Sequence, residues 1–396
     1  MRWLFHDPSN RTEAAARKRT LARIDRWWEQ FAAKAPALND LFAGKKKWDL
    51  PAWMDDTLQA ISPHLMWEYG PAVRGRGHRL VITPESHMEL RPLTTAILER
   101  APKIAGWEFY PYRLAEDLDM ARETVEARTG GTLDEVTVEA RIGEGNRIDL
   151  MFRSPITEDE DDQEARGVAF VATETLLGEQ ALDRWVGAIE VGAMSKRARK
   201  SGAVCLERLK GTFDALVGSI RDRLPPRPLL EVAADAKWFL VELEPEEADD
   251  YPGRTDLFVT VTLDVDLWKA MHAHMPFASE RFSRCGQTFA YVKIEGPEGP
   301  GGLKLEERTK IEDALNEALG PDKLGVHIGG GTGLRYSYVD LALTDLARGV
   351  EVVRRTLQVG KVPKRTWVLF FDADLCGEWV GAYPETSAPP MAEEEE

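Results

Sequence analysis

The chain has little cysteine and no long apolar run. Its 396 residues include only Cys205, Cys285 and Cys376, which are odd in number and far apart. Such a set does not suit a disulfide framework and fits reduced thiols better. No stretch approaches the roughly 18 to 20 apolar residues of a membrane-spanning helix, and the first residues lack the apolar core of an export signal. These absences predict a cytoplasmic protein with no membrane partner.

Recognisable catalytic motifs are also missing. The sequence contains no Gly-x-x-x-x-Gly-Lys-Ser/Thr phosphate loop, no Gly-x-Ser-x-Gly nucleophile elbow, no His-Glu-x-x-His and no Cys-x-x-Cys pair. We therefore expect no catalytic residue, no bound metal and no cofactor.

Three short patterns allow other chemistry. His272 and His274 would share a face on a strand, but their surroundings predict the end of a helix, where the two side chains point apart. Cys285 is typical of an ordinary loop cysteine, although a cationic neighbour can activate such a thiol. Asp372 and Asp374 follow the last predicted strand, where paired carboxylates can bind magnesium, yet no third acidic ligand is recognisable nearby. In each case we favour an ordinary structural role over a metal site or a reactive thiol.

The charge balance is strongly acidic. Asp and Glu total 67 against 51 Lys and Arg, so the formal net charge is -16. Binding to nucleic acid phosphates needs a basic face, so we expect no nucleic acid partner. An acidic surface favours a basic protein partner instead.

Hydrophobic patterning predicts an α+β fold of two domains, with mostly antiparallel or mixed sheets flanked by helices and preceded by an N-terminal helical segment. The length favours two domains. The proline-rich stretch Leu224–Pro228 marks their boundary, because proline fixes φ and removes hydrogen-bond donors. The predicted division is a helical segment at 1–62, a first α+β domain at 63–224, a second at 235–384 and a disordered acidic tail at 385–396.

Periodicity and turn residues predict the individual elements. In the helical segment, apolar residues at helical spacing predict one helix that ends near Pro36 and a shorter one that ends near Pro63. Two apolar runs, Ala169–Thr173 and Trp238–Leu243, each predict a strand. Alternating segments at 136–142 and 147–152, separated by a glycine-containing turn, predict a hairpin.

One segment resembles a recurring part of uncharacterised bacterial proteins. The matching features are the strand His78–Ile82, which runs into Thr83-Pro84-Glu85, then a helix, Ala101-Pro102 and Gly106-Trp107-Glu108-Phe109. The resemblance is confined to about residues 78–112. It implies a bacterial origin and an α+β domain, and it carries no activity and no catalytic residue.

The run Gly329-Gly330-Gly331-Thr332-Gly333 is the one place that suggests a phosphate-binding loop. It is similar to the phosphate-contacting loop of tubulin-like GTPases, where backbone N–H groups and a helix N-terminus hold phosphate. That mechanism requires a helix directly after the loop, whereas Arg335–Asp340 alternates as a strand does. The sequence therefore favours a tight turn between two strands. The alternative is a ligand site formed by His327, the glycine run and Asp340.

Tryptophan is abundant, with 12 residues in the chain, and several lie in the predicted N-terminal helices. Trp27, Trp28, Trp48 and Trp53 could each fill a core, but together they make an interaction surface plausible, since tryptophan also anchors interfaces. With the acidic charge and the missing motifs, they predict a non-catalytic protein-binding module, such as an adaptor, a regulator or an immunity-type inhibitor. The competing prediction is an enzyme or sensor that binds a nucleotide or another phosphate ligand at the glycine run.

Overall fold

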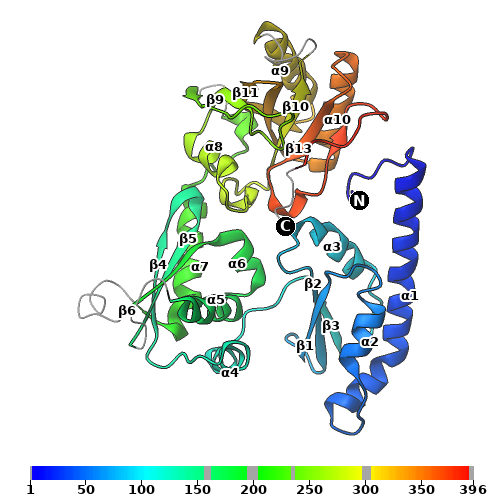
Figure 1. Ribbon diagram of the computed structural model, residues 1–396, viewed down its shortest axis with the longest axis vertical. Coiled ribbons are helices and arrows are strands. Elements are labelled where there is room, and N and C mark those ends of the chain that lie inside the picture. Colours follow the sequence, from blue (N-terminus) through cyan, green and yellow to red (C-terminus); the bar gives the residue numbers. More distant parts are fainter. Residues whose placement is uncertain (1, 156–161, 194–203, 233–236, 297–304, 392–396) are drawn as a thin grey trace.

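The computed structural model describes residues 2–155, 162–193, 204–232, 237–296 and 305–391. It confirms the predicted α+β class, because helices accompany three separate sheets of antiparallel or mixed strands. Figure 1 shows three packed units, which we call the first unit (residues 2–112), the middle unit (113–224) and the last unit (237–391). No helix within the described ranges is both long and apolar enough to cross a membrane.

The first unit packs two helices from the N-terminal segment against a small mixed sheet. Strand β2 lies between β1 and β3, antiparallel to the former and parallel to the latter. Trp27, Trp28 and Phe31 fill the core together with Leu80 and Ile82 of the sheet. The elements are α1 (Arg11–Phe42), α2 (Leu50–Thr57), β1 (Met66–Pro71), β2 (His78–Thr83), η1 (Met88–Leu90), α3 (Arg91–Glu99) and β3 (Trp107–Tyr110).

Helix α1 does not end near Pro36, so that prediction is wrong. The helix continues through the proline to Phe42. Proline removes one helical hydrogen bond and crowds the preceding turn. However, Ala35 and Leu38 on either side are buried in the core of the first unit. This tertiary packing offsets the local cost, which a sequence pattern does not show.

The middle unit is a four-stranded sheet of order β6-β5-β4-β7 with helices against it. The predicted hairpin is confirmed as the antiparallel pair β4 and β5, and its turn uses the positive φ angles of Gly145 and Asn146. The elements are α4 (Leu118–Thr129), β4 (Thr137–Ile142), β5 (Ile148–Ser154), α5 (Gln163–Leu177), α6 (Glu179–Trp185), β6 (Val186–Ala193), β7 (Val204–Cys205) and α7 (Leu209–Arg223).

The predicted strand Ala169–Thr173 is wrong, because these residues lie inside α5. Asp162 caps the start of this helix by accepting a hydrogen bond from the Ala165 N–H. The run from Val171 to Leu177 is buried throughout. A helix buried on nearly every side reads as a continuous apolar run, which periodicity cannot distinguish from a buried strand.

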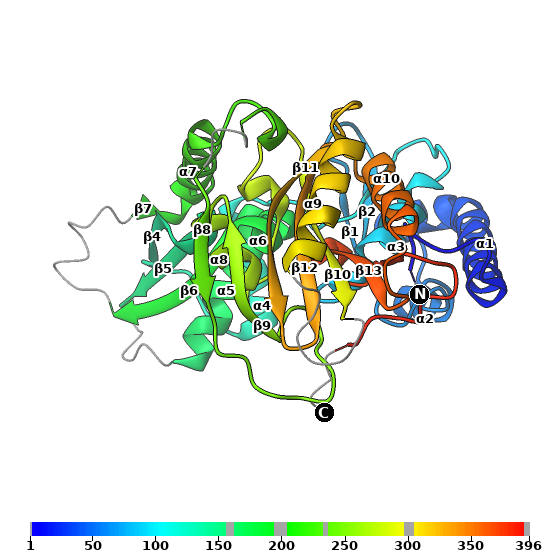
Figure 2. The same ribbon diagram turned by 90° about the horizontal axis from the view of Figure 1, so that it is seen from above.

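The last unit is a seven-stranded antiparallel sheet of order β14-β13-β10-β12-β11-β9-β8. Helices α9 and α10 cover one face of it (Figure 2), and their apolar side chains form a core with β10, β12 and β13. The elements are β8 (Phe239–Glu242), β9 (Leu257–Thr262), α8 (Val265–His272), β10 (Thr288–Glu295), α9 (Leu305–Leu319), β11 (Gly325–Gly333), β12 (Tyr336–Leu343), α10 (Leu346–Val359), β13 (Thr366–Phe370), η8 (Ala373–Leu375) and β14 (Val380–Gly381).

Both ends of the chain are tied to the last unit. Near the start, the N–H groups of Trp3, Leu4 and Phe5 donate to the buried carboxylate of Glu378. Near the end, Trp367 donates its indole N–H to the Ser387 carbonyl oxygen at 2.6 Å. Part of the predicted tail is therefore anchored, while its last five residues lie outside the described ranges.

Candidate functional site

The glycine run lies within strand β11, not at a turn. Its backbone is paired on both sides, with β12 and with β9. The next element along the chain is β12, reached through Leu334 and Arg335. The turn therefore follows the glycines, and the helix that a phosphate loop requires does not begin there.

The close approach of the neighbouring strands explains why glycine occupies these positions. A Cβ atom on Gly330 would lie 2.4 Å from the Tyr338 carbonyl oxygen, and one on Gly331 would lie 2.5 Å from Cδ2 of Leu257. Non-bonded atoms do not approach each other this closely, so both positions need a residue without a side chain. The run has a packing role in this sheet.

His327 and Asp340 contact different partners. Nε2 of His327 lies 3.6 Å from the Glu312 carboxylate of α9, and burial lowers the pKa of this histidine to about 4. Asp340 pairs with Arg254 at 2.7 Å, and burial raises the pKa of Asp340 although Arg254 opposes the shift. Register pairs Asp340 with Gly329 but His327 with Leu341. The structure thus brings Asp340 beside the glycine strand and turns His327 toward α9.

The four tryptophans considered as an interface divide into two groups. Trp27 and Trp28 are 2% and 3% exposed and belong to the core of the first unit. Trp48 and Trp53 are half-buried at the margin of that core, with ring centroids 5.5 Å apart. Only the second pair presents surface that another molecule could contact.

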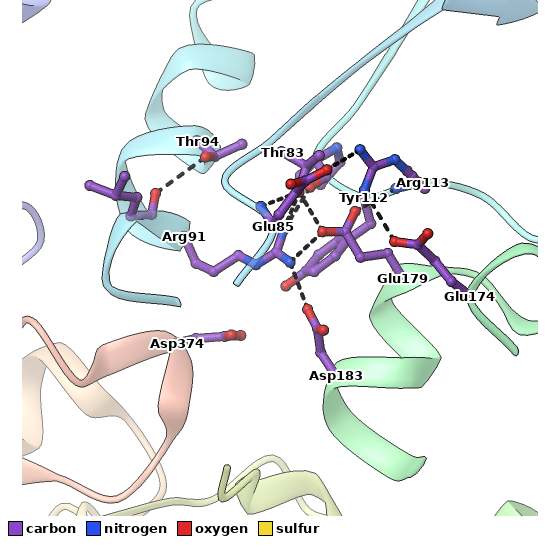
Figure 3. Close-up of polar contacts among 12 residues, drawn as sticks. Thr83, Glu85, Arg91, Thr94, Tyr112, Arg113, Glu174, Glu179, Asp183 and Asp374 are labelled. Atoms are coloured by element: carbon purple, nitrogen blue, oxygen red, sulfur yellow. Dashed lines mark hydrogen bonds and ion pairs between the residues drawn. The ribbon is translucent and has the colours of Figure 1, made fainter. Parts of the chain in front are cut away.

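A network of charged side chains links the first unit to the middle unit, and Asp374 of the last unit lies nearby (Figure 3). Together with Arg184, which pairs with Asp374, we call this network the junction. Arg91 of α3 pairs with Glu179 at 2.8 Å and with Asp183 at 2.6 Å, both on α6. Arg184 of α6 pairs in turn with Asp374 of η8 at 2.6 Å. The first, middle and last units are therefore linked through two arginine side chains, both of which lie close to the ring of Tyr112.

A cavity of about 220 Å³ lies beside the junction, and its polar lining includes Asp183, Arg184, Asp372 and Asp374. Burial raises the pKa of Asp183 to about 7, and the negative charges of Glu179 and Asp374 add to the rise while Arg91 opposes it. Burial also raises the pKa of Asp372, which accepts hydrogen bonds from Ser279.

Each of the aspartates at the junction already has a partner within the protein. Asp183 has Arg91, Asp374 has Arg184, and Asp372 has Ser279. Within the described part of the chain, no three His, Cys, Asp or Glu side chains gather as metal ligands would. This arrangement is suited to joining units, since buried charges need such pairing to be tolerated.

A different surface is open to other molecules, at the outer edge of the seven-stranded sheet. Strand β8 is the last strand on one side of that sheet and pairs with β9. Around it Trp238, Phe239 and Leu240 are 48%, 46% and 64% exposed. We call the stretch Trp238–Glu242 the β8 edge.

Among the residues that the structure describes, the backbone of the β8 edge also has N–H and C=O groups without a hydrogen-bond partner. Leu243 donates its N–H to the Phe258 carbonyl oxygen, so these two residues form a hydrogen-bonded pair across β8 and β9. Antiparallel strands alternate such pairs, which places Val241 opposite Thr260 in the next one. The N–H and C=O groups of Leu240 and Glu242 therefore point away from β9.

Sequence patterning predicted the strand here but not its place in the sheet. The residues Trp238–Leu243 predicted a strand, and β8 confirms it. Edge position depends on which strands pair, and this follows from the whole chain. The one local signal is the abrupt change from apolar residues to the acidic stretch that begins at Glu242.

Comparisons of the chain with family models, with curated proteins and with solved structures found no match.

Proposed function

We propose that this protein is a non-catalytic binding module that holds another protein at the β8 edge, as an adaptor, a regulator or an immunity-type inhibitor. The observation that carries the proposal is an open sheet edge that is also apolar. Proteins usually protect edge strands with charge, proline, a bulge or a covering segment, because an open edge recruits another strand. Addition of an extended peptide to such an edge is a common mode of protein recognition.

Exposed aromatic residues support the same proposal. Trp238 stacks on His327 with ring centroids 5.3 Å apart, yet 48% of the residue remains exposed. Large aromatic side chains that are packed on one side and exposed on the other are frequent anchors in protein interfaces. Leu240 beside it adds apolar surface that a partner would remove from water.

The charged groups elsewhere support a module without catalysis. At the junction, Asp183, Asp372 and Asp374 hold neighbouring side chains of the protein itself. We place the module in the cytoplasm, which the three free cysteines support, since thiols stay reduced there.

The proposal is tested by cross-linking from the β8 edge inside the cell that produces the protein. A photoreactive amino acid replaces Leu240 in one variant and Val359 in another. Val359, at the end of α10, is 82% exposed and serves as the matched apolar control. We expect one dominant protein adduct from position 240 that is missing from position 359. The same adducts from both positions, or none from position 240, would overturn the proposal.

The competing prediction of a phosphate ligand at Gly329–Gly333 has its own test. A ligand present at 100 times its Kd stabilises a protein by about 2.7 kcal/mol. A thermal-shift screen against nucleotides, inorganic phosphate and divalent metals would detect that change, and we expect no shift. A nucleotide that raises the unfolding midpoint would favour the enzyme or sensor instead.

A further inference from the structure

We infer that the partner presents an extended segment that is basic at its N-terminal end and apolar at its C-terminal end, and that this segment pairs antiparallel with β8. The inference rests on the proposed function and names the chemistry of its partner. It follows from three properties of the β8 edge: its free backbone groups, its gradient of side-chain character and the direction of its neighbours.

The backbone supplies the first property. Leu240 and Glu242 direct their N–H and C=O groups outward, as the pairing of Leu243 with Phe258 requires. Two residues of this kind, two positions apart, form the repeating unit by which an antiparallel strand adds to an edge. The partner segment is therefore extended, and its residue opposite Leu240 or Glu242 exchanges both backbone hydrogen bonds with it.

Side chains supply the second property, because their character changes sharply along the edge. The N-terminal end offers Trp238, Phe239 and Leu240, which are apolar and exposed. The C-terminal end continues into a segment rich in exposed carboxylates, which we call the acidic segment. Its members are Glu242, Glu244, Glu246, Glu247 and Asp249.

These carboxylates have no cation of their own within the described residues. None of the five takes part in an ion pair there, although Asp250 immediately after them pairs with Arg365 at 2.6 Å. With a net charge of -16 on the whole chain, the acidic segment repels acidic segments and attracts lysine and arginine. The partner is therefore basic where it passes Glu242 and apolar where it passes Leu240.

Direction is the third property. All pairs in this sheet are antiparallel, including β8 with β9, and antiparallel pairs are the more common and slightly more stable type. An antiparallel strand on β8 begins beside the acidic segment and ends beside Trp238. Its basic residues therefore come first in its sequence.

The test uses four synthetic octapeptides with a fluorescent label, and binding to the full chain is measured by anisotropy. The peptide KRKTVIVT has the inferred order. Its reversal TVIVTKRK tests direction, EDETVIVT tests charge, and KRKTVPVT blocks pairing because proline lacks the N–H that the added strand needs. We expect KRKTVIVT to bind, with the other three at least tenfold weaker.

Two proline variants of the protein locate the site. Leu240→Pro removes an outward N–H without deleting a bond to β9, so it blocks partner addition while leaving the sheet paired. Val241→Pro deletes a ladder bond to Thr260 and is the control for damage to the sheet itself. We expect Leu240→Pro to abolish peptide binding with an unfolding midpoint close to that of the wild type, and Val359→Lys on α10 to leave binding unchanged.

Charge reversal tests the acidic segment directly. Glu244→Lys and Glu246→Lys should each weaken binding of KRKTVIVT roughly threefold and strengthen binding of EDETVIVT, a size typical of exposed ion pairs. Higher salt should weaken the wild-type complex in the same direction.

Each other result rejects a defined part of the inference. Equal binding of the basic and acidic peptides, lost in Leu240→Pro, would overturn the basic partner but leave the β8 edge as the proposed site. Binding only of the reversed peptide would overturn the antiparallel direction. Binding that survives Leu240→Pro, or a dimer of the chain that this variant abolishes, would overturn the location or the kind of partner. If no peptide binds, the inference fails, and cross-linking from position 240 still decides the proposed function separately.

Discussion

At the scale of single residues, buried carboxylates have very different surroundings in this protein. Glu378 receives three backbone N–H groups, whereas Asp183 lies near two other acidic groups and has Arg91 as its cation. Burial raises the energy of an ionised carboxylate, and only nearby cations or donors compensate. Asp183 is incompletely compensated, and its stability contribution therefore depends on pH.

The predicted pH dependence has a definite sign. The pKa of Asp183 is about 7 in the folded protein and 3.8 as its ordinary value, so the folded state holds this proton over a range where the unfolded chain has released it. Stability from this group is present below about pH 4 and is lost as the pH rises to about 7, by up to about 4 kcal/mol.

Asp183→Asn removes this titration while keeping the shape of the side chain. We expect its unfolding midpoint to fall less between pH 5 and pH 8 than that of the wild type. Thermal unfolding at both pH values measures the difference, with Asp25→Asn as the control, because Asp25 pairs with Arg100 at the surface. Parallel pH profiles for wild type and Asp183→Asn would contradict the expectation.

At the scale of elements, β11 is shaped by its neighbours more than by its own preferences. Glycine weakens a strand intrinsically, yet the run at Gly329–Gly333 pairs on both sides. The reason is the short distance that a Cβ atom would have from β12 at Gly330 and from β9 at Gly331. Here the close packing of the strands outweighs the low strand propensity of glycine.

Two glycine substitutions separate packing from propensity. Gly330→Ala places a methyl group 2.4 Å from the Tyr338 carbonyl oxygen, so the strands must move, and we expect a loss of about 1–3 kcal/mol in the free energy of unfolding. Gly218→Ala on α7 meets nothing within 4 Å and should instead stabilise by roughly 0.5–1 kcal/mol. Chemical denaturation of both variants measures the two signs. A stabilising Gly330→Ala would show that the strands are not closely packed at this point.

At the scale of the whole molecule, buried and half-buried polar contacts connect the units. Arg91 and Arg184 link all three units at the junction. Glu378 fixes the start of the chain to the last unit, while Trp3 packs in the core of the first unit. Phe5 stacks on Phe370 of β13 with ring centroids 5.0 Å apart.

Removal of the Glu378 carboxylate tests this link. Glu378→Ala leaves the N–H groups of Trp3, Leu4 and Phe5 without their acceptor. The Trp3 hydrogen bond is buried, and an unsatisfied buried donor costs about 1–3 kcal/mol, whereas water can reach the partly exposed N–H groups of Leu4 and Phe5. We expect a lower unfolding midpoint and faster amide exchange at residues 3–5. Glu385→Ala is the control, since Glu385 forms an exposed pair with Lys364 and should change stability by less than about 1 kcal/mol. Equal effects of the two substitutions would show that Glu378 does not hold the N-terminus.

By itself the amino-acid sequence determined the features that depend on near neighbours. The hairpin of β4 and β5, the strand β8 and the α+β class follow from alternation, turn residues and helical spacing, and the structure confirms them. Where burial surrounds a segment on all sides, as in α5, or where packing carries a helix through Pro36, the local pattern was not sufficient.

Only the tertiary structure decided where the candidate site lies. The residues Trp238–Leu243 predicted a strand, but the exposure of this strand depends on β8 being the last strand of a sheet whose other members lie between Leu257 and Gly381. The junction likewise unites Arg91, Asp183 and Asp374 from three parts of the chain. Strand order and ion pairing are set by long-range packing, in which hydrophobic burial outweighs local preference, so no local pattern contains them.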